Sequence, residues 1–383
     1  MSPRLRSTII TVHLWLGLII GFVWALEGLT GSLLVFNRDV ERWSLHETDS
    51  GPLLPLDEIF ARAAKAAHAR VGEIETFGPS HTLFTAYFDD AAGHAKALII
   101  DGRSGVVRAW RDPDALVPEG GSTWRWLLRL HEALLMGDKG GVLVGTSGLL
   151  LLSSLTLGAI LGWPRARMWG AAFAASRWRS TRQKLYGWHR AMGLVAIPVL
   201  AVMVPCGVYQ ALAPQLKPAL VRYAGYRQPF RAKPVKRLPA HIITAQRALD
   251  LARSRFPGAY LMRAVRPTCK APVYAFRLWQ PKELRRWAGT TTVAVDAASG
   301  KILATYDPLN GPMANVVTDN IYPIHTGEAG GLALRILYML VGLSLPGLYV
   351  TGLWSWLHRR KINRPGPVKA APKRALTPEG ASR

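Results

Sequence analysis

Four of the ten histidines in this chain occur as matched pairs at fixed spacings. His13 and His189 are 176 residues apart, and His131 and His325 are 194 residues apart. Glycines follow the same two spacings at Gly17 and Gly193, Gly31 and Gly207, Gly137 and Gly331, and Gly158 and Gly352. Because imidazole is the commonest metal ligand among side chains, histidines that repeat with their surroundings indicate two pairs of metal ligands. The matches also indicate a tandem duplication of the chain.

Long apolar runs carry or adjoin these histidines. The runs cover residues 9–36, 142–163, 185–212 and 332–357. Each is long enough to cross a bilayer, which takes about 20 residues. His13 and His189 lie near the start of the first and third runs, whereas His131 and His325 lie just before the second and fourth. We therefore predict an α-helical membrane protein with four transmembrane helices.

Much of the formal net charge of +24 comes from segments that flank the apolar runs. Residues 164–184 form a strongly basic connection, and residues 358–383 form a basic tail. Cytoplasmic loops of membrane proteins are enriched in Lys and Arg. We predict that both segments and both termini are cytoplasmic, which places residues 37–130 and 213–325 on the outer side. Basic charge placed in this way does not require a nucleic-acid partner.

The two outer segments follow one plan, which predicts two small α+β domains. Each begins with apolar residues at helical spacing, over residues 56–70 in the first and near 243–255 in the second. Each continues with strand-like alternation and ends in two apolar stretches around a turn, at residues 101–105 and 296–300. An apolar stretch on either side of a turn rich in Asp and Gly is typical of a β-hairpin.

The predicted orientation sorts the histidines by depth. His13 and His189 share the cytoplasmic layer, and His131 and His325 share the outer layer. Two imidazole pairs stacked across a bilayer are what two haems require, each iron taking one histidine from either side. No Cys-x-x-Cys-His motif occurs in the chain, so we predict two b-type haems that are held without covalent links.

Other interpretations of single residues stay open in the sequence. A histidine at a helix end often anchors in the headgroup region, and His358, beside Arg359, is a rival ligand for the inner haem. Glu27 lies inside the first run, where its carboxylate either serves the outer haem or is solvated in a wet cavity. The histidines without a matched partner are interpreted as surface residues: His46, His68, His81, His94 and His241.

Short motifs throughout the chain resemble the PepSY-associated transmembrane family of bacterial inner-membrane proteins. They are His-Leu-Trp-Leu-Gly at 13–17, Trp-His-Arg-Ala-Met-Gly at 188–193, Ile-His-Thr-Gly at 324–327, the two turns, and Val-Thr-Gly-Leu-Trp at 350–354. The resemblance implies that both outer segments are periplasmic PepSY-like domains. It also implies that the haem ligands are His13, His189, His131 and His325.

Within that family the chain looks most like the ferrisiderophore reductases of the ferrioxamine-reductase kind. The likeness implies an enzyme that takes electrons from a cytoplasmic or quinone donor and reduces iron(III)-siderophores at the periplasmic side, releasing iron(II) for uptake. A non-enzymatic PepSY-type envelope sensor or protease inhibitor, anchored by the helices, is the alternative. Matched histidine pairs favour the reductase, because an anchor does not need them.

Overall fold

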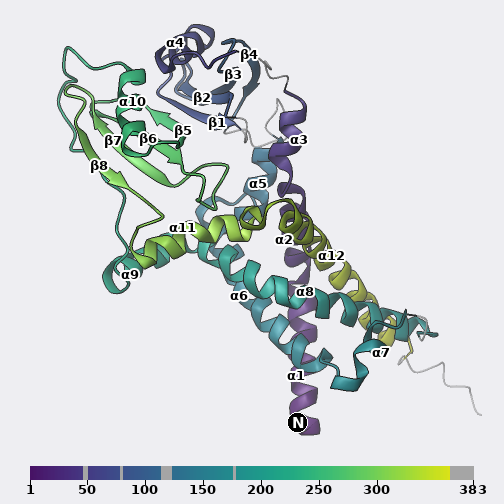
Figure 1. Cartoon of the computed structure of the whole chain (residues 1–383). Coiled ribbons are helices and arrows are strands. Elements are labelled where there is room, and N and C mark those ends of the chain that lie inside the picture. Colours follow the sequence, from purple (N-terminus) through teal and green to yellow (C-terminus); the bar gives the residue numbers. More distant parts are fainter. Residues whose placement is uncertain (46–50, 78–80, 114–122, 176–177, 363–383) are drawn as a thin grey trace, which may run out of the picture.

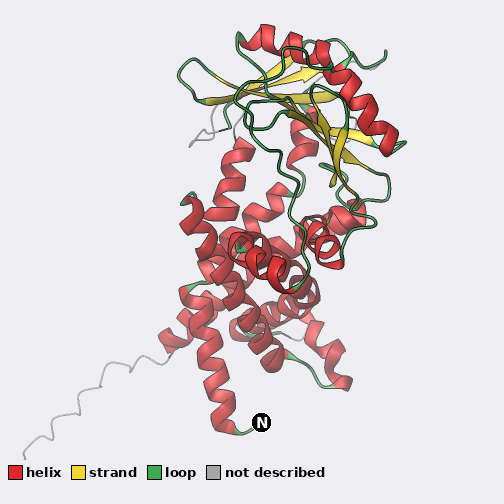
Figure 2. Ribbon diagram, turned by 90° about the vertical axis from the view of Figure 1, so that its left-hand side faces the viewer, coloured by secondary structure: helices red, strands yellow, loops and turns green. Residues whose placement is uncertain are grey.

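The computed structural model describes residues 1–45, 51–77, 81–113, 123–175 and 178–362. Long helices gather at one end of the molecule and a β-sheet lies at the other (Figures 1 and 2). His46 and the part of the predicted basic tail from residue 363 onward lie outside the described residues.

Apolar helices form the bundle. In the described part of the chain, three helices are long and apolar enough to cross a membrane: α6 (Gly137–Gly162), α8 (Thr181–Ala211) and α12 (Gly331–Ile362). α1 (Pro3–Ile19) and α2 (Gly21–Leu34) pass the same test together, which gives a fourth span if the bent pair crosses as one. The helices pack around a buried apolar core that includes Trp24, Leu151, Leu200 and Leu345.

The first apolar run, predicted as one helix over residues 9–36, is two helices with a bend of 59°. The break lies at Ile20, directly before Gly21. A Cβ atom at Gly21 would lie 2.8 Å from Cδ2 of Tyr349 on α12, so only glycine allows this close approach. Helices commonly bend at glycine. The apolar pattern continues through the break and therefore does not reveal it.

Short helices connect the bundle to the sheet. α5 (Thr123–Ala133) precedes α6, and α11 (Met313–His325) precedes α12 through the turn η3 (Glu328–Gly330). Both lie between the sheet and the bundle (Figure 1). The other short helices are α3 (Asn37–Trp43), η1 (Ala166–Met168), α7 (Trp169–Phe173) and α9 (Ala213–Tyr223).

Two antiparallel four-stranded halves build the sheet, in the order β4-β3-β2-β1-β5-β6-β7-β8. The first half holds β1 (Glu73–Phe77), β2 (Leu83–Asp89), β3 (Ala95–Asp101) and β4 (Val107–Arg111). The second holds β5 (Tyr260–Val265), β6 (Val273–Trp279), β7 (Thr291–Asp296) and β8 (Ile302–Tyr306). Both predicted hairpins are confirmed, as β3–β4 and β7–β8.

The two halves are one continuous sheet, because β1 pairs with β5 through Ile74 and Ala264. The two outer segments that the sequence separates therefore share one structure. Helices α4 (Leu56–Ala67) and α10 (Ala245–Arg255) pack on one face and bury Phe60, Ile74 and Phe276 with the rest of the larger core. α4 ends earlier than predicted because His68 takes a left-handed conformation with φ of 48°.

The N-termini of α4 and α10 cap each other. The Asp57 carboxylate accepts hydrogen bonds from the backbone N–H groups of Ala245 (2.8 Å) and Gln246 (2.9 Å). In return, the Gln246 side-chain oxygen accepts a bond from the N–H of Leu56 at 2.9 Å. These contacts satisfy amide groups that have no partner within their own helices.

We expect Asp57→Ala to lower the free energy of unfolding of the sheet by about 1–2 kcal/mol, because it leaves two helix N–H groups without acceptors. Hydrogen exchange of α10 amides in the detergent-solubilised protein measures this change. Glu58→Ala is the control, since it removes only an exposed ion pair with Arg62 and should cost about 0.5 kcal/mol or less. Equal losses in the two variants would contradict the capping role.

Candidate functional site

The structure brings the four matched histidines together in two pairs. The ring centroids of His13 and His189 are 6.2 Å apart, and those of His131 and His325 are 6.3 Å apart. We call the second pair the sheet-side pair, because its helices α5 and α11 lie next to the sheet, and the first the far pair (Figure 1). These are the same two pairs that the sequence predicts.

Each ring of the far pair is held at its Nδ1 atom by the neighbouring helix. His13 Nδ1 lies 3.1 Å from the backbone oxygen of Ser154 and 3.1 Å from its hydroxyl. His189 Nδ1 lies 3.1 Å from the backbone oxygen of Leu348 and 3.1 Å from the Thr351 hydroxyl. A carbonyl oxygen only accepts hydrogen bonds, so Nδ1 carries the proton in both rings.

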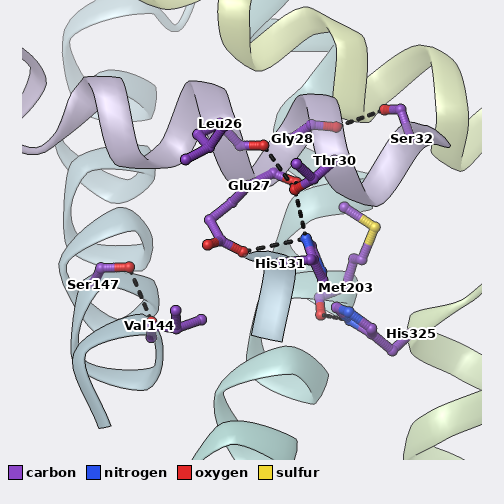
Figure 3. Close-up of polar contacts among 10 residues, drawn as sticks. All are labelled: Leu26, Glu27, Gly28, Thr30, Ser32, His131, Val144, Ser147, Met203 and His325. Atoms are coloured by element: carbon purple, nitrogen blue, oxygen red, sulfur yellow. Dashed lines mark hydrogen bonds and ion pairs between the residues drawn. The ribbon is translucent and has the colours of Figure 1, made fainter. Parts of the chain in front are cut away.

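The sheet-side pair is held in the same way (Figure 3). His325 Nδ1 donates to the backbone oxygen of Met203 at 2.9 Å. His131 Nδ1 lies 3.0 Å from the Thr30 hydroxyl oxygen and 3.2 Å from Oε2 of Glu27. In a neutral imidazole with its proton on Nδ1, the lone pair of Nε2 is free to bind a metal. All four rings are therefore fixed in the tautomer that offers Nε2.

A glycine on a neighbouring helix faces the Cε1 edge of every ring. A Cβ atom at these glycines would lie 3.2 Å (Gly158 to His13), 3.4 Å (Gly352 to His189), 2.9 Å (Gly31 to His131) and 2.8 Å (Gly207 to His325) from that atom. These are four of the glycines that repeat with the histidines in the sequence. The repeat of Gly31 and Gly207 thus has a steric reason, since a Cβ atom there would overlap the ring, whereas the contacts at Gly158 and Gly352 are looser.

A cavity of about 1260 Å³ adjoins the sheet-side pair. It extends from the apolar side chains of Trp24 and Leu200 to the charged side chains of Arg38 and Arg335. Most ligand pockets have volumes of about 300–1,000 Å³, so there is space for a large ligand. Burial, helped by the neighbouring His325 ring, lowers the pKa of His131 to about 4. Its imidazole is therefore neutral at pH 7, which is the form that binds metals.

The two-histidine arrangement fits a metal that brings further ligands of its own. No cluster of three or more His, Cys, Asp or Glu side chains suited to a bare ion occurs within the described residues. An imidazole nitrogen binds a metal at about 2 Å, so rings on opposite sides of one metal have centroids about 6 Å apart. The observed 6.2 Å and 6.3 Å agree with that separation.

The sequence profile of the PepSY-associated TM region matches residues 10–359. The chain belongs to this family. All four paired histidines lie within the match, and the family assignment agrees with the resemblance found in the sequence. No curated protein sequence matches the chain significantly. The narrower likeness to ferrisiderophore reductases stays a prediction.

The remaining sequence-predicted residues lie elsewhere in this PepSY-associated protein. His358 lines a small surface pocket with Leu353, Trp354 and other residues of α12, whereas the ring that faces His13 is His189. His81 differs from the predicted ordinary surface residue. It has a positive φ of 55°, and its ring stacks on Tyr260 with centroids 4.8 Å apart.

The sequence did not reveal the groups that hold the histidine rings. Each ring has a backbone carbonyl among them, at Ser154, Leu348, Met203 and Glu27, and a carbonyl acceptor has no signature in residue types. The one available signal is spacing, because Ser154 and Leu348 are separated by the same 194 residues as His131 and His325. Thr30 and Thr351 could not be distinguished from other helical threonines.

We expect Gly207→Ala to destabilise the protein by about 1–3 kcal/mol, because the added methyl group overlaps the His325 ring. The loss should be smaller in a His325→Ala background, where the methyl group has space. Thermal unfolding of the two single variants and the double variant gives this coupling. Gly162→Ala is the control, since its Cβ would make an ordinary 3.7 Å contact with Arg190. If the losses of stability in the two single variants add up in the double variant, Gly207 does not position the His325 ring.

Proposed function

We propose that this protein is a dihaem reductase of the bacterial inner membrane that passes electrons to iron(III)-siderophores on the sheet side. The observation that carries the proposal is the pair of histidine sites, each with the ring separation of a single metal and with Nε2 free. Two imidazoles at each site would hold a haem, which brings further nitrogen ligands of its own. Bound b-type haem would supply one-electron redox chemistry at each pair.

The chain's own residues have defined roles in this proposal. His13 and His189 would hold one haem, and His131 and His325 would hold the other. The carbonyls and hydroxyls at Nδ1 keep the rings in one tautomer and one orientation. The matched glycines let the helices approach closely enough to place each ring.

The placement of basic residues supports the orientation across the membrane. Arg165, Arg167, Arg182 and Lys184 lie in or beside the connection from α6 to α8, at the end of the bundle away from the sheet (Figure 1). The N-terminus and the end of α12 lie at the same end. By the positive-inside rule this end is cytoplasmic and the sheet is periplasmic. The sheet-side pair would then be the exit point for electrons, and a cytoplasmic or quinone donor would serve the far pair.

Chelated iron(III) is a substrate that such an exit point suits. Hard oxygen ligands hold iron(III) more firmly than iron(II), so one-electron reduction weakens the chelate and releases the metal. The two sheet segments differ in charge, with 15 acidic and 11 basic residues in 37–132 but 6 acidic and 18 basic in 213–328. Together they offer both signs of charge to a docked chelate.

We expect the purified protein to contain two low-spin b haems, and His13→Ala or His189→Ala to remove one of them and leave the other. Each variant takes away one of the two histidines that would hold the haem at the far pair, and leaves the sheet-side pair intact. Absorption spectra with a haem-to-protein ratio measure the outcome. His358→Ala should keep both haems. Two unchanged haems in either far-pair variant would contradict the assignment of that pair.

We expect dithionite-reduced protein to be reoxidised anaerobically by an iron(III)-siderophore, with iron(II) appearing in a ferrous chelator. His325→Ala should slow this transfer at least tenfold, because tunnelling falls steeply with distance and the far pair is deep in the bundle. The gallium(III) form of the siderophore is the control, since it can dock but cannot accept an electron. Equal behaviour of the iron and gallium forms would favour the envelope sensor or protease inhibitor instead.

A further inference from the structure

The two histidine pairs differ in symmetry. In the far pair, the carbonyl acceptors Ser154 and Leu348 occupy equivalent positions of the two halves, 194 residues apart. In the sheet-side pair, Glu27 and Met203 are also equivalent, at the 176-residue spacing of His13 and His189. Met203 and Glu27 each offer their ring a backbone carbonyl, and Glu27 adds a side-chain carboxyl group, whose Oε2 atom lies near His131 Nδ1. One carboxylate thus breaks the twofold pattern at one site.

Glu27 has few other contacts to explain its position. Its Oε2 atom lies 3.2 Å from His131 Nδ1, and its Oε1 atom is buried without a hydrogen-bond partner in the described structure. The side chain is 15% exposed and lines the large cavity. A carboxylate in an apolar bundle costs free energy, and the equivalent methionine shows that an uncharged residue is compatible with this place. Within the described residues, His131 and its Nδ1 atom lie next to this carboxyl group.

The Thr30 hydroxyl shares this contact but has a different character. Thr30 Oγ1 donates to the backbone oxygen of Leu26 at 2.8 Å, so its lone pair faces His131 Nδ1. It is a neutral acceptor, comparable to Thr351 beside His189 in the far pair. Figure 3 shows Glu27 and Thr30 reaching the same ring nitrogen from α2. The carboxyl group of Glu27 is therefore the feature that sets His131 apart from the other three rings.

We propose that Glu27 is a positioning residue that lowers the reduction potential of the sheet-side centre. The inference rests on haem binding in the proposed function. A carboxylate that accepts the Nδ1 proton gives imidazole more imidazolate character and makes it a stronger donor through Nε2. A stronger donor and a nearby negative charge both stabilise the oxidised metal more than the reduced metal. With Glu27, the sheet-side centre becomes a stronger reductant than it would be with an uncharged residue such as methionine at this position.

The test is a spectroelectrochemical titration of the haem-loaded protein at constant pH, comparing the parent with Glu27→Gln. Glutamine keeps the size and an acceptor oxygen but removes the charge. We expect one midpoint potential to rise and the other to stay unchanged. Glu27→Met introduces the residue found at the equivalent position, Met203, and should shift the same potential in the same direction. In a His13→Ala background, which keeps only the sheet-side haem, the same titration shows whether the shifted potential belongs to that haem.

Thr30→Val is the matched control, because it removes the other Nδ1 acceptor without changing charge. It should shift the potential by less than half as much as Glu27→Gln. Unchanged potentials in Glu27→Gln with both haems bound would overturn the inference and leave the reductase proposal standing. An equal shift of both potentials would overturn it too, since it would indicate a general field effect. Parent protein without haem would instead overturn the proposed function itself.

Discussion

Each matched histidine is fixed by a hydrogen bond at Nδ1 and by contact of its Cε1 edge with a glycine, and the arrangement of the helices depends on these two contacts. Every ring has among its acceptors a carbonyl of a helical residue, which has a second lone pair available beside its helix bond. An apolar helix can therefore hold a polar ring without polar side chains of its own. The glycines set how closely α5 and α11 approach α2 and α8, as with Gly31 and Gly207.

The apolar core keeps the two pairs apart. Met203 and Leu348, which hold rings of different pairs, both pack against the cluster formed by Trp24, Leu200 and its neighbours. Trp24 is 6% exposed, and its indole N–H donates to the backbone oxygen of Ser147 at 3.0 Å. In such an apolar region water screens charges little, so an electrostatic interaction is strong and weakens mainly with distance. The carboxyl group of Glu27, which contacts His131, therefore acts more on the sheet-side pair than on the far pair.

Sequence patterns predicted the parts of the molecule that depend on local periodicity or on repetition. The apolar runs predicted the long helices, the turns with Asp and Gly predicted both hairpins, and the fixed spacings predicted both histidine pairs. The bend at Ile20 was not predicted because the apolar pattern continues through it, and the close approach of Gly21 to Tyr349 involves a residue far away in the chain. The carbonyl acceptors escaped because every residue has a carbonyl. Haem, its redox role and the chelate stay predictions, since residue geometry fits a cofactor without identifying it.

The pairing of β1 with β5 links strands that are far apart in the chain, as Glu73 with Val265 shows. Two candidate membrane spans, α6 and α8, lie between them. During synthesis the first half-sheet therefore emerges with β1 as an open edge. This edge can pair with β5 only after both spans and β5 have been synthesised. Open edges of this kind invite pairing with other chains. Contacts between distant segments also form slowly. The continuous sheet thus makes the order of membrane insertion a condition for correct folding.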